Sequence, residues 1–72
     1  MTEPQAIQVT VNGKPVSTRP GIPVPDLLQS LDMNPERVIV EWNGMAKTRE
    51  ESAKIELAGG DVLEVVRIVA GG

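Results

Sequence analysis

The sequence lacks the residues on which most catalytic and metal sites depend. Its 72 residues include no Cys, His, Tyr or Phe and a single Trp. Without thiolate or imidazole side chains, the chain cannot provide a Cys nucleophile, a His general base or the usual Cys and His ligands of zinc. Any chemistry carried by this chain must use carboxylates, amines, hydroxyls or the chain ends.

Charge and hydrophobicity argue against two classes of partner. Ten acidic residues against seven basic ones give a formal net charge of −3. There is no basic field for phosphates and no row of aromatic stacking surfaces. No apolar run approaches the ~20 residues that span a bilayer, and residues 1–5 lack the charged and apolar regions of a signal peptide. We expect no nucleic acid and no membrane as partner, and a cytoplasmic protein whose lack of Cys fits a reducing compartment.

Hydrophobic periodicity predicts a hairpin followed by a helix. Residues 5–11 alternate between apolar and polar, and Asn12-Gly13 suits a two-residue turn, so residues 14–18 return antiparallel. Beyond a cluster of Pro and Gly, apolar residues recur at helical spacing, at Val24, Leu27, Leu28 and Leu31. We expect Asn34-Pro35 to end this helix, because Asn tolerates the left-handed conformation and Pro does not continue a helix.

The second half of the chain predicts three more extended segments. Alternation resumes over residues 37–42, Asn43-Gly44 marks a second tight turn, and residues 45–47 form a short partner strand. The last strand is Val62 to Val69, which is rich in β-branched residues. Between these strands we expect an irregular segment or one helical turn at residues 48–54. A brief extended piece follows at residues 55–57, and a turn at residues 58–61.

These elements predict an α+β domain, with one helix packed on one face of a mixed sheet of four to five strands. A first hairpin that connects through a helix to later strands, with the last strand central, is the β-grasp arrangement. We expect one domain over residues 1–69 and a flexible tail at residues 70–72. A domain of this size buries only about 60% of its unfolded surface, so a deep active-site cleft is not expected.

The predicted final strand is apolar on both faces. If Leu63 and Val65 join the core beneath the helix, then Ile39, Val66 and Ile68 lie on the open face of the sheet. These three residues are a candidate partner surface. The alternative is that scattered surface Ile and Val residues need no explanation.

The remaining side chains offer no recognisable catalytic or phosphate-binding group. Trp42 shares the strand register of Val38 and Val40, which favours a core or core-edge position over a binding hot spot. Glu50-Glu51 lie in a polar, solvated segment. Gly59-Gly60 lead into a strand, which is the wrong context for a phosphate-binding loop.

The chain ends in two glycines directly after the final strand. With little or no side chain, Ala70, Gly71 and Gly72 form a thin tail that can enter a narrow site of another protein. The reactive group would be the α-carboxylate of Gly72, which needs activation, most simply by attack on ATP to give an acyl-adenylate. A partner would supply the nucleotide site, so we expect a carrier that binds no cofactor itself and is not an enzyme. The alternative is a frayed chain end.

Four segments together resemble one known family. Residues 38–44 (VIVEWNG), Arg49, residues 60–66 (GDVLEVV) and residues 68–72 (IVAGG) are similar in order and spacing to ThiS, the sulfur carrier family of thiamine biosynthesis. That family belongs to the ubiquitin-like β-grasp superfamily. The likeness covers nearly the whole chain, including the helix. Where many members carry Pro before the Arg, this chain has Thr48.

The resemblance implies a cycle of reactions at the tail. Gly72 matches the carboxylate that is adenylated and then becomes a thiocarboxylate, Gly71 matches its neighbour, and Arg49 is a candidate partner contact. A ThiF-like adenylating enzyme would use ATP and Mg, and a sulfur donor fed by a cysteine desulfurase would provide the sulfur. Thiazole synthase, a ThiG-like enzyme, would then receive that sulfur. The free carrier is expected to be a monomer.

Other interpretations of the tail stay open. The small subunit of molybdopterin synthase shares the fold, the Gly-Gly end and the thiocarboxylate chemistry. That family is usually longer and often has prolines before its tail, where this chain has Arg67-Ile68-Val69-Ala70, so we favour the thiamine carrier. A carrier for tRNA thiolation, a ubiquitin-like modifier joined through Gly72 to lysines, and a purely structural interaction module are further alternatives.

Overall fold

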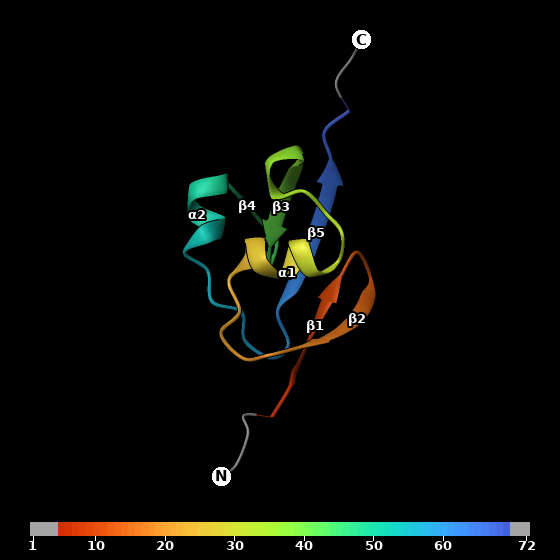
Figure 1. The fold of residues 1–72 in the computed structure, drawn as a ribbon, viewed down its shortest axis with the longest axis vertical. Helices are drawn as coiled ribbons and strands as arrows, with labels where there is room; N and C mark the ends of the chain where they lie inside the picture. Colours follow the sequence, from red (N-terminus) through yellow and green to blue (C-terminus); the bar gives the residue numbers. More distant parts are fainter. Residues whose placement is uncertain (1–4, 70–72) are drawn as a thin grey trace.

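The protein folds around a mixed five-stranded sheet with strand order β2-β1-β5-β3-β4 (Figure 1). The structure is a computed structural model, which describes residues 5–69. The strands are β1 (Ile7–Val11), β2 (Lys14–Thr18), β3 (Val38–Trp42), β4 (Met45–Lys47) and β5 (Val62–Arg67). Strands β1 and β5 are parallel and the other neighbours are antiparallel. The last strand is therefore central, and the predicted α+β β-grasp fold is confirmed.

The first hairpin forms as its pattern predicts. Asn12 and Gly13 take φ angles of 51° and 80°, which suit a two-residue turn between right-twisted strands. The turn is closed by the pair Val11–Lys14. Backbone hydrogen bonds alternate along an antiparallel pair, so the backbone nitrogen of the next residue, Pro15, points to the outer edge of the sheet. This nitrogen carries no hydrogen. A proline there removes a donor from an otherwise open edge.

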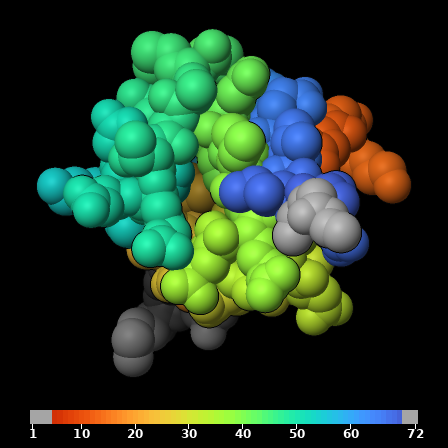
Figure 2. All heavy atoms as spheres, turned by 90° about the horizontal axis from the view of Figure 1, so that it is seen from above, coloured from red at the N-terminus to blue at the C-terminus, as the bar shows by residue number. Residues whose placement is uncertain are grey.

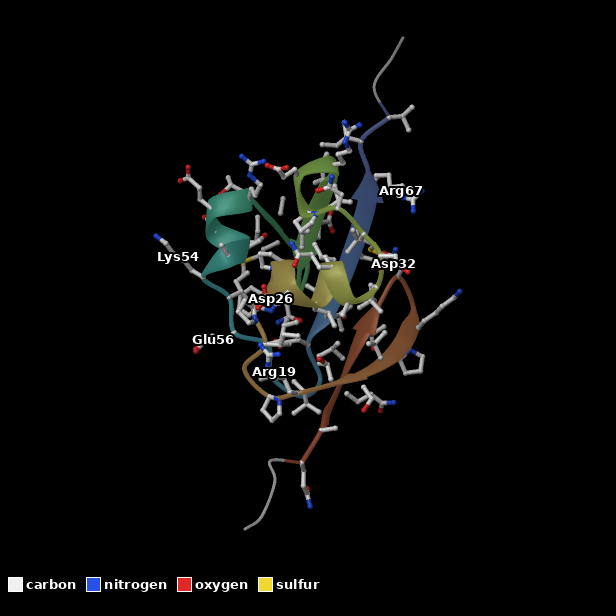
Figure 3. The ribbon with its side chains drawn as sticks, in the orientation of Figure 1. Arg19, Asp26, Asp32, Lys54, Glu56 and Arg67 are labelled. Carbon is white, nitrogen blue, oxygen red and sulfur yellow. The ribbon has the colours of Figure 1, made fainter. Side chains whose placement is uncertain are left out.

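Helix α1 (Val24–Ser30) lays the predicted apolar stripe across the sheet. Val24, Leu27 and Leu28 are each no more than 1% exposed. Pro25 lies in the first turn, where its missing N–H has no helical partner. Asp26 is in the same turn, complements the positive end of the helix dipole, and lies 3.7 Å from the guanidinium of Arg19 (Figure 3).

The predicted end of this helix at Asn34-Pro35 is wrong. The chain leaves the helix at Asp32, which takes a φ of 60°. There Met33 N–H donates to Leu28 C=O at 2.9 Å and Asp32 N–H donates to Gln29 C=O at 3.1 Å. This pair of bonds is a Schellman termination. Asn34 instead caps a short 3-10 helix, η1 (Pro35–Arg37), by accepting the Glu36 N–H at 2.9 Å.

The second half follows the predicted order, with one strand shorter than expected. Asn43 and Gly44 take φ angles of 49° and 85° in the turn between β3 and β4, and a short helix α2 (Arg49–Ala53) follows. Strand β5 ends at Arg67 rather than Val69, because its partner β3 begins at Val38, the residue that pairs with Arg67. Helix α2 contacts α1 on the same side of the sheet. None of the helices in residues 5–69 is long and apolar enough to cross a membrane.

The core lies between the sheet and the two helices. It contains the predicted strand residues and helix stripe, together with two residues that the sequence did not reveal, Ile22 and Leu57. Leu57 N–H donates to Ile22 C=O at 3.0 Å, and Gly21 N–H donates to Leu57 C=O at 2.9 Å. These bonds hold the extended piece before β5 against the segment that enters α1. Trp42 packs at the edge of this core, as predicted.

Candidate functional site

The end of strand β5 is the structural base of the predicted tail. Seen from the end of the molecule, the last residues of β5 lie between the β3 side and the β1–β2 hairpin (Figure 2). Ile68 N–H donates to Arg37 C=O at 2.8 Å, and the side chain of the next residue, Val69, is 85% exposed. The predicted tail residues Ala70, Gly71 and Gly72 lie outside the described residues.

The candidate partner surface falls on the open face of the sheet. Ile39 and Val66 are direct cross-strand partners and are 53% and 61% exposed. Ile68 follows on the same side of β5 and is 52% exposed. The predicted sidedness of these three residues is confirmed. Their role as a partner surface stays a prediction.

Arg49 lies apart from these three residues. It is the first residue of α2, on the helix side of the sheet, where it lines a small hollow together with Leu28 and Val40. Its Nη1 atom lies 3.2 Å from Oε1 of Glu36, which gives it an exposed ion pair within the chain. A partner that contacts the open face would therefore not reach Arg49 through the same contact.

Thr48, the residue that departs from the family pattern, begins helix α2. Its hydroxyl accepts the Glu51 N–H at 3.1 Å, and its own N–H donates to the Glu51 carboxylate at 2.9 Å. These two bonds form a capping box. The N–H of Thr48 lowers the pKa of the Glu51 carboxyl below its ordinary value, because the bond favours the charged form. Thr48 thus has a local structural role that a proline, which has no N–H, could not fill.

Two asparagine side chains hold β5 from opposite sides. Asn12 Nδ2 donates to Val65 C=O at 3.1 Å, and Val65 N–H donates to Asn12 Oδ1 at 2.7 Å. On the other side, Val62 N–H donates to Asn43 Oδ1 at 2.8 Å. Each side chain amide thereby takes the place of a strand backbone. Sequence reasoning assigned both asparagines to turns only, and no separate signal in the sequence marks this second role.

The Asp61 carboxylate connects the second turn to the start of β5. Its Oδ2 accepts Trp42 Nε1–H at 3.2 Å and Ala58 N–H at 2.9 Å, and its Oδ1 accepts Asn43 Nδ2–H at 3.1 Å. Burial raises the pKa of Asp61, but these hydrogen bonds outweigh it, so the pKa lies below its ordinary value. The carboxylate is a structural anchor that places Trp42 and the turn.

Two open hollows lie on the surface formed by residues 5–69. One of about 280 Å³ lies beside the first hairpin, lined by residues that include Val16 and Met33, and one of about 230 Å³ lies at the end of the sheet near Arg37 and Arg67. Within residues 5–69 no three carboxylates gather as metal ligands. The chemistry was predicted for residues 70–72, which lie beyond the described part of the chain.

Comparisons with known proteins agree with this description. The sequence model of the ThiS family matches residues 5–72. The chain is 38% identical over 66 residues to the uncharacterized protein ycf40 of Pyropia yezoensis, which covers 92% of this chain and 93% of that protein. It is 32% identical over 62 residues to ycf40 of Trieres chinensis, over 86% of this chain and 85% of that protein.

A solved structure extends the likeness to three dimensions. The crystal structure of the thiamine biosynthesis protein ThiS of Geobacter metallireducens matches with a TM-score of 0.70 at 36% identity, over 92% of this chain and 100% of that chain. The family match, over residues 5–72, spans all five strands of the sheet. With its sequence matched from the residues before β1 through Gly72, the chain belongs to the ThiS family.

Proposed function

We propose that this protein is a sulfur carrier of thiamine biosynthesis. The observation that carries the proposal is the extent of the family match, which runs through Gly71 and Gly72 at the end of the chain. The Geobacter metallireducens protein, matched over its full length, is itself named for thiamine biosynthesis. Together these matches favour the thiamine pathway over the molybdopterin, tRNA-thiolation and modifier alternatives.

The proposed chemistry takes place at the α-carboxylate of Gly72. In a ThiF-like adenylating enzyme with ATP and Mg, a carboxylate oxygen attacks the α-phosphorus, a new O–P bond forms, and pyrophosphate leaves. A sulfur nucleophile from a donor fed by a cysteine desulfurase then attacks the activated carbonyl carbon. The bond between this carbon and the AMP oxygen breaks, and AMP leaves. Where the nucleophile is the terminal sulfur of a donor persulfide, the product is an acyl disulfide; a thiol then attacks the donor sulfur, the S–S bond breaks, and the end group is released as a thiocarboxylate.

Delivery would regenerate the carrier. A thiazole synthase of the ThiG type would accept the sulfur: the carbon–sulfur bond of the thiocarboxylate would break, its carbonyl carbon would take an oxygen from the acceptor substrate or from water, and the Gly72 carboxylate would be free for another cycle. In this scheme the chain is a co-substrate of its partner enzymes. The nucleotide, the metal and the catalytic groups belong to the partners.

The described part of the chain supports a division between body and tail. The bond from Ile68 N–H to Arg37 C=O fixes the base of the tail, and the strongly exposed Val69 follows it. A partner can therefore bind the folded body while it reacts with residues beyond Val69. Small end residues allow entry into a narrow site.

Intact-mass measurement tests the proposal directly. Incubation of the full chain with a purified ThiF-like enzyme, Mg-ATP and a sulfur source should increase its mass by the difference between sulfur and oxygen. Fragmentation should place the change on the last residue. If the mass does not change while the same enzyme modifies another carrier, the sulfur-carrier function is wrong.

A deletion of Gly72 provides the matched control. The variant should fold as the wild type does, because no described element includes that residue, and it should gain no sulfur. A variant that still gains sulfur would contradict the assignment to Gly72. A strain that lacks the gene should require thiamine, whereas loss of molybdenum-enzyme activity with normal thiamine synthesis would favour the molybdopterin alternative.

A further inference from the structure

The open face of the sheet changes from apolar to acidic along β3 and β5. The exposed pair Ile39–Val66 is followed, two positions along, by the pair Glu41–Glu64. Both glutamates are exposed and belong to the two central neighbouring strands. The register therefore places two carboxylates opposite each other, beside the candidate partner surface.

The two glutamates are direct cross-strand neighbours in the hydrogen-bonded type of antiparallel pair. Bonds from Asn43 N–H to Val62 C=O at 2.8 Å and from Ile68 N–H to Arg37 C=O at 2.8 Å set the alternation of the ladder. By that alternation Glu41 and Glu64 form a hydrogen-bonded pair, with Cα atoms about 5.5 Å apart and side chains on the same face. Like charges directly opposite each other destabilise a sheet.

No cation within the described residues compensates for this repulsion. The two ion pairs of residues 5–69 are Arg19–Asp26 and Arg49–Glu36, and neither includes these glutamates. The basic strand residues Lys14, Lys47 and Arg67 pair with Val11, Val40 and Val38, whose side chains face the helix layer. Arg37 lies in η1, and the Ile39–Val66 pair separates it from the two glutamates.

We infer that Glu41 and Glu64 are a docking site for an arginine or lysine side chain of the adenylating partner, inserted beside an apolar side chain that covers Ile39 and Val66. One cation between two carboxylates would remove their mutual repulsion, and the adjacent aliphatic pair would bury apolar area. This inference rests on the proposed function and specifies the chemistry of its partner surface.

The charge on this face also selects against a second copy of the chain. Two open faces brought together would oppose four carboxylates with no cation from the strands. Complementary charge raises the rate of encounter and excludes wrong partners, so the same glutamates would favour a basic enzyme surface over self-association. We expect the free chain to stay monomeric at concentrations where it binds the enzyme.

Charge reversal tests the docking site without loss of the fold. In the double variant Glu41→Lys/Glu64→Lys one like-charge pair replaces another, so the unfolding midpoint should stay close to that of the wild type. Its Kd for a purified ThiF-like enzyme, measured by calorimetry without ATP, should rise more than tenfold. The matched control is Glu56→Lys, whose exposed side chain points away from the body, and it should leave the Kd within about twofold (Figure 3).

Neutral variants provide a second readout. Glu41→Gln or Glu64→Gln should raise the midpoint of urea unfolding, because the repulsion is removed, and should weaken enzyme binding severalfold. A merely structural role would move stability and binding in the same direction. A rise in stability together with a loss of binding is specific to a pair kept for a partner.

The outcomes separate this inference from the proposed function. If wild-type chain gains sulfur but the double variant binds like Glu56→Lys, the docking site is wrong and the carrier function stands. If wild-type chain binds the enzyme through Glu41 and Glu64 but gains no sulfur, the carrier function is wrong and the docking site stands. Absence of wild-type binding, or self-association through the open face, overturns the docking site.

Discussion

The two Asn-Gly turns share a sequence and a backbone conformation, yet they hold the central strand differently. Both asparagines have φ angles near 50°, at 51° and 49°. Asn12 binds both the N–H and the C=O of Val65, in a partly buried position. The side chain of Asn43 binds only the N–H of Val62, and its second contact is the half-buried Asp61 carboxylate.

The difference teaches that a turn motif fixes local conformation but not tertiary role. The backbone of each Asn-Gly pair follows from the need for positive φ angles. What the amide binds depends on where β5 passes the end of each hairpin. Strand β1 runs parallel to β5 and β3 runs antiparallel to it, so one turn meets the middle of β5 and the other meets its start.

The largest loss of stability should follow removal of the Asp61 carboxylate, which binds the second turn. Asp61→Ala removes the acceptor of Trp42, Asn43 and Ala58, and should lower the free energy of unfolding by about 2 kcal/mol. Urea unfolding followed by Trp42 fluorescence would measure it. Glu56→Ala, an exposed acidic control, should change stability by less than about 0.5 kcal/mol. Equal effects of the two variants would contradict the anchoring role.

A smaller effect is expected at the first turn. Asn12→Gly keeps the positive φ but removes both bonds to Val65, and should lower the free energy of unfolding by about 1.5 kcal/mol. Hydrogen exchange should accelerate at the Val65 amide more than at amides of β3. Unchanged protection of the Val65 N–H would refute the view that the side chain amide of Asn12 replaces the backbone of a neighbouring strand.

The second turn should tolerate the same change better. Asn43→Gly removes one backbone contact and one contact to Asp61, both exposed, and should lower the free energy of unfolding by about 1 kcal/mol. In double-mutant cycles with Asp61→Ala, Asn43→Gly should be non-additive and Asn12→Gly additive. If both turns couple equally to Asp61, the contrast between them fails.

The smallest effect should appear on acidification. The pKa of Asp61 is lowered in the folded state, so its contribution to stability is complete above its ordinary value of 3.8 and is lost as pH falls through the lowered value. In the Asp61→Asn variant, the free energy of unfolding should therefore fall less steeply as the pH is lowered than it does in the wild type. In the Asn12→Gly variant, it should fall as steeply as in the wild type. Urea midpoints measured at several pH values below about 5 would decide this.

Local patterns predicted most of the fold, and the errors arise where distant segments meet. The order of the elements along the chain, both turns and the start of α1 follow from the hydrophobic period and from the positions of Pro and Gly. The helix end is wrong because the chain already turns at Asp32, before Pro35 can act. Ile22 and Leu57 were missed because they reach the core through bonds between segments far apart in sequence.

The candidate site was predictable only in part. The alternation of β3 and β5 places Ile39 and Val66 on the open face without knowledge of the structure. That Glu41 faces Glu64 depends on the register between those strands, which no single segment contains. The separation of Arg49 from the open face likewise depends on the side of the sheet on which α2 packs.

The parallel pair of β1 and β5 has a mechanical consequence. Because the first and last strands run side by side in the same direction, a force that pulls them apart by the two ends of the chain acts along the strands (Figure 1). The bonds from Thr10 N–H to Asp61 C=O and from Asn12 N–H to Leu63 C=O, each 2.9 Å, would then be sheared together with the amide of Asn12. Such a pair resists extraction as a unit, whereas a hairpin pulled from its open end separates one bond at a time.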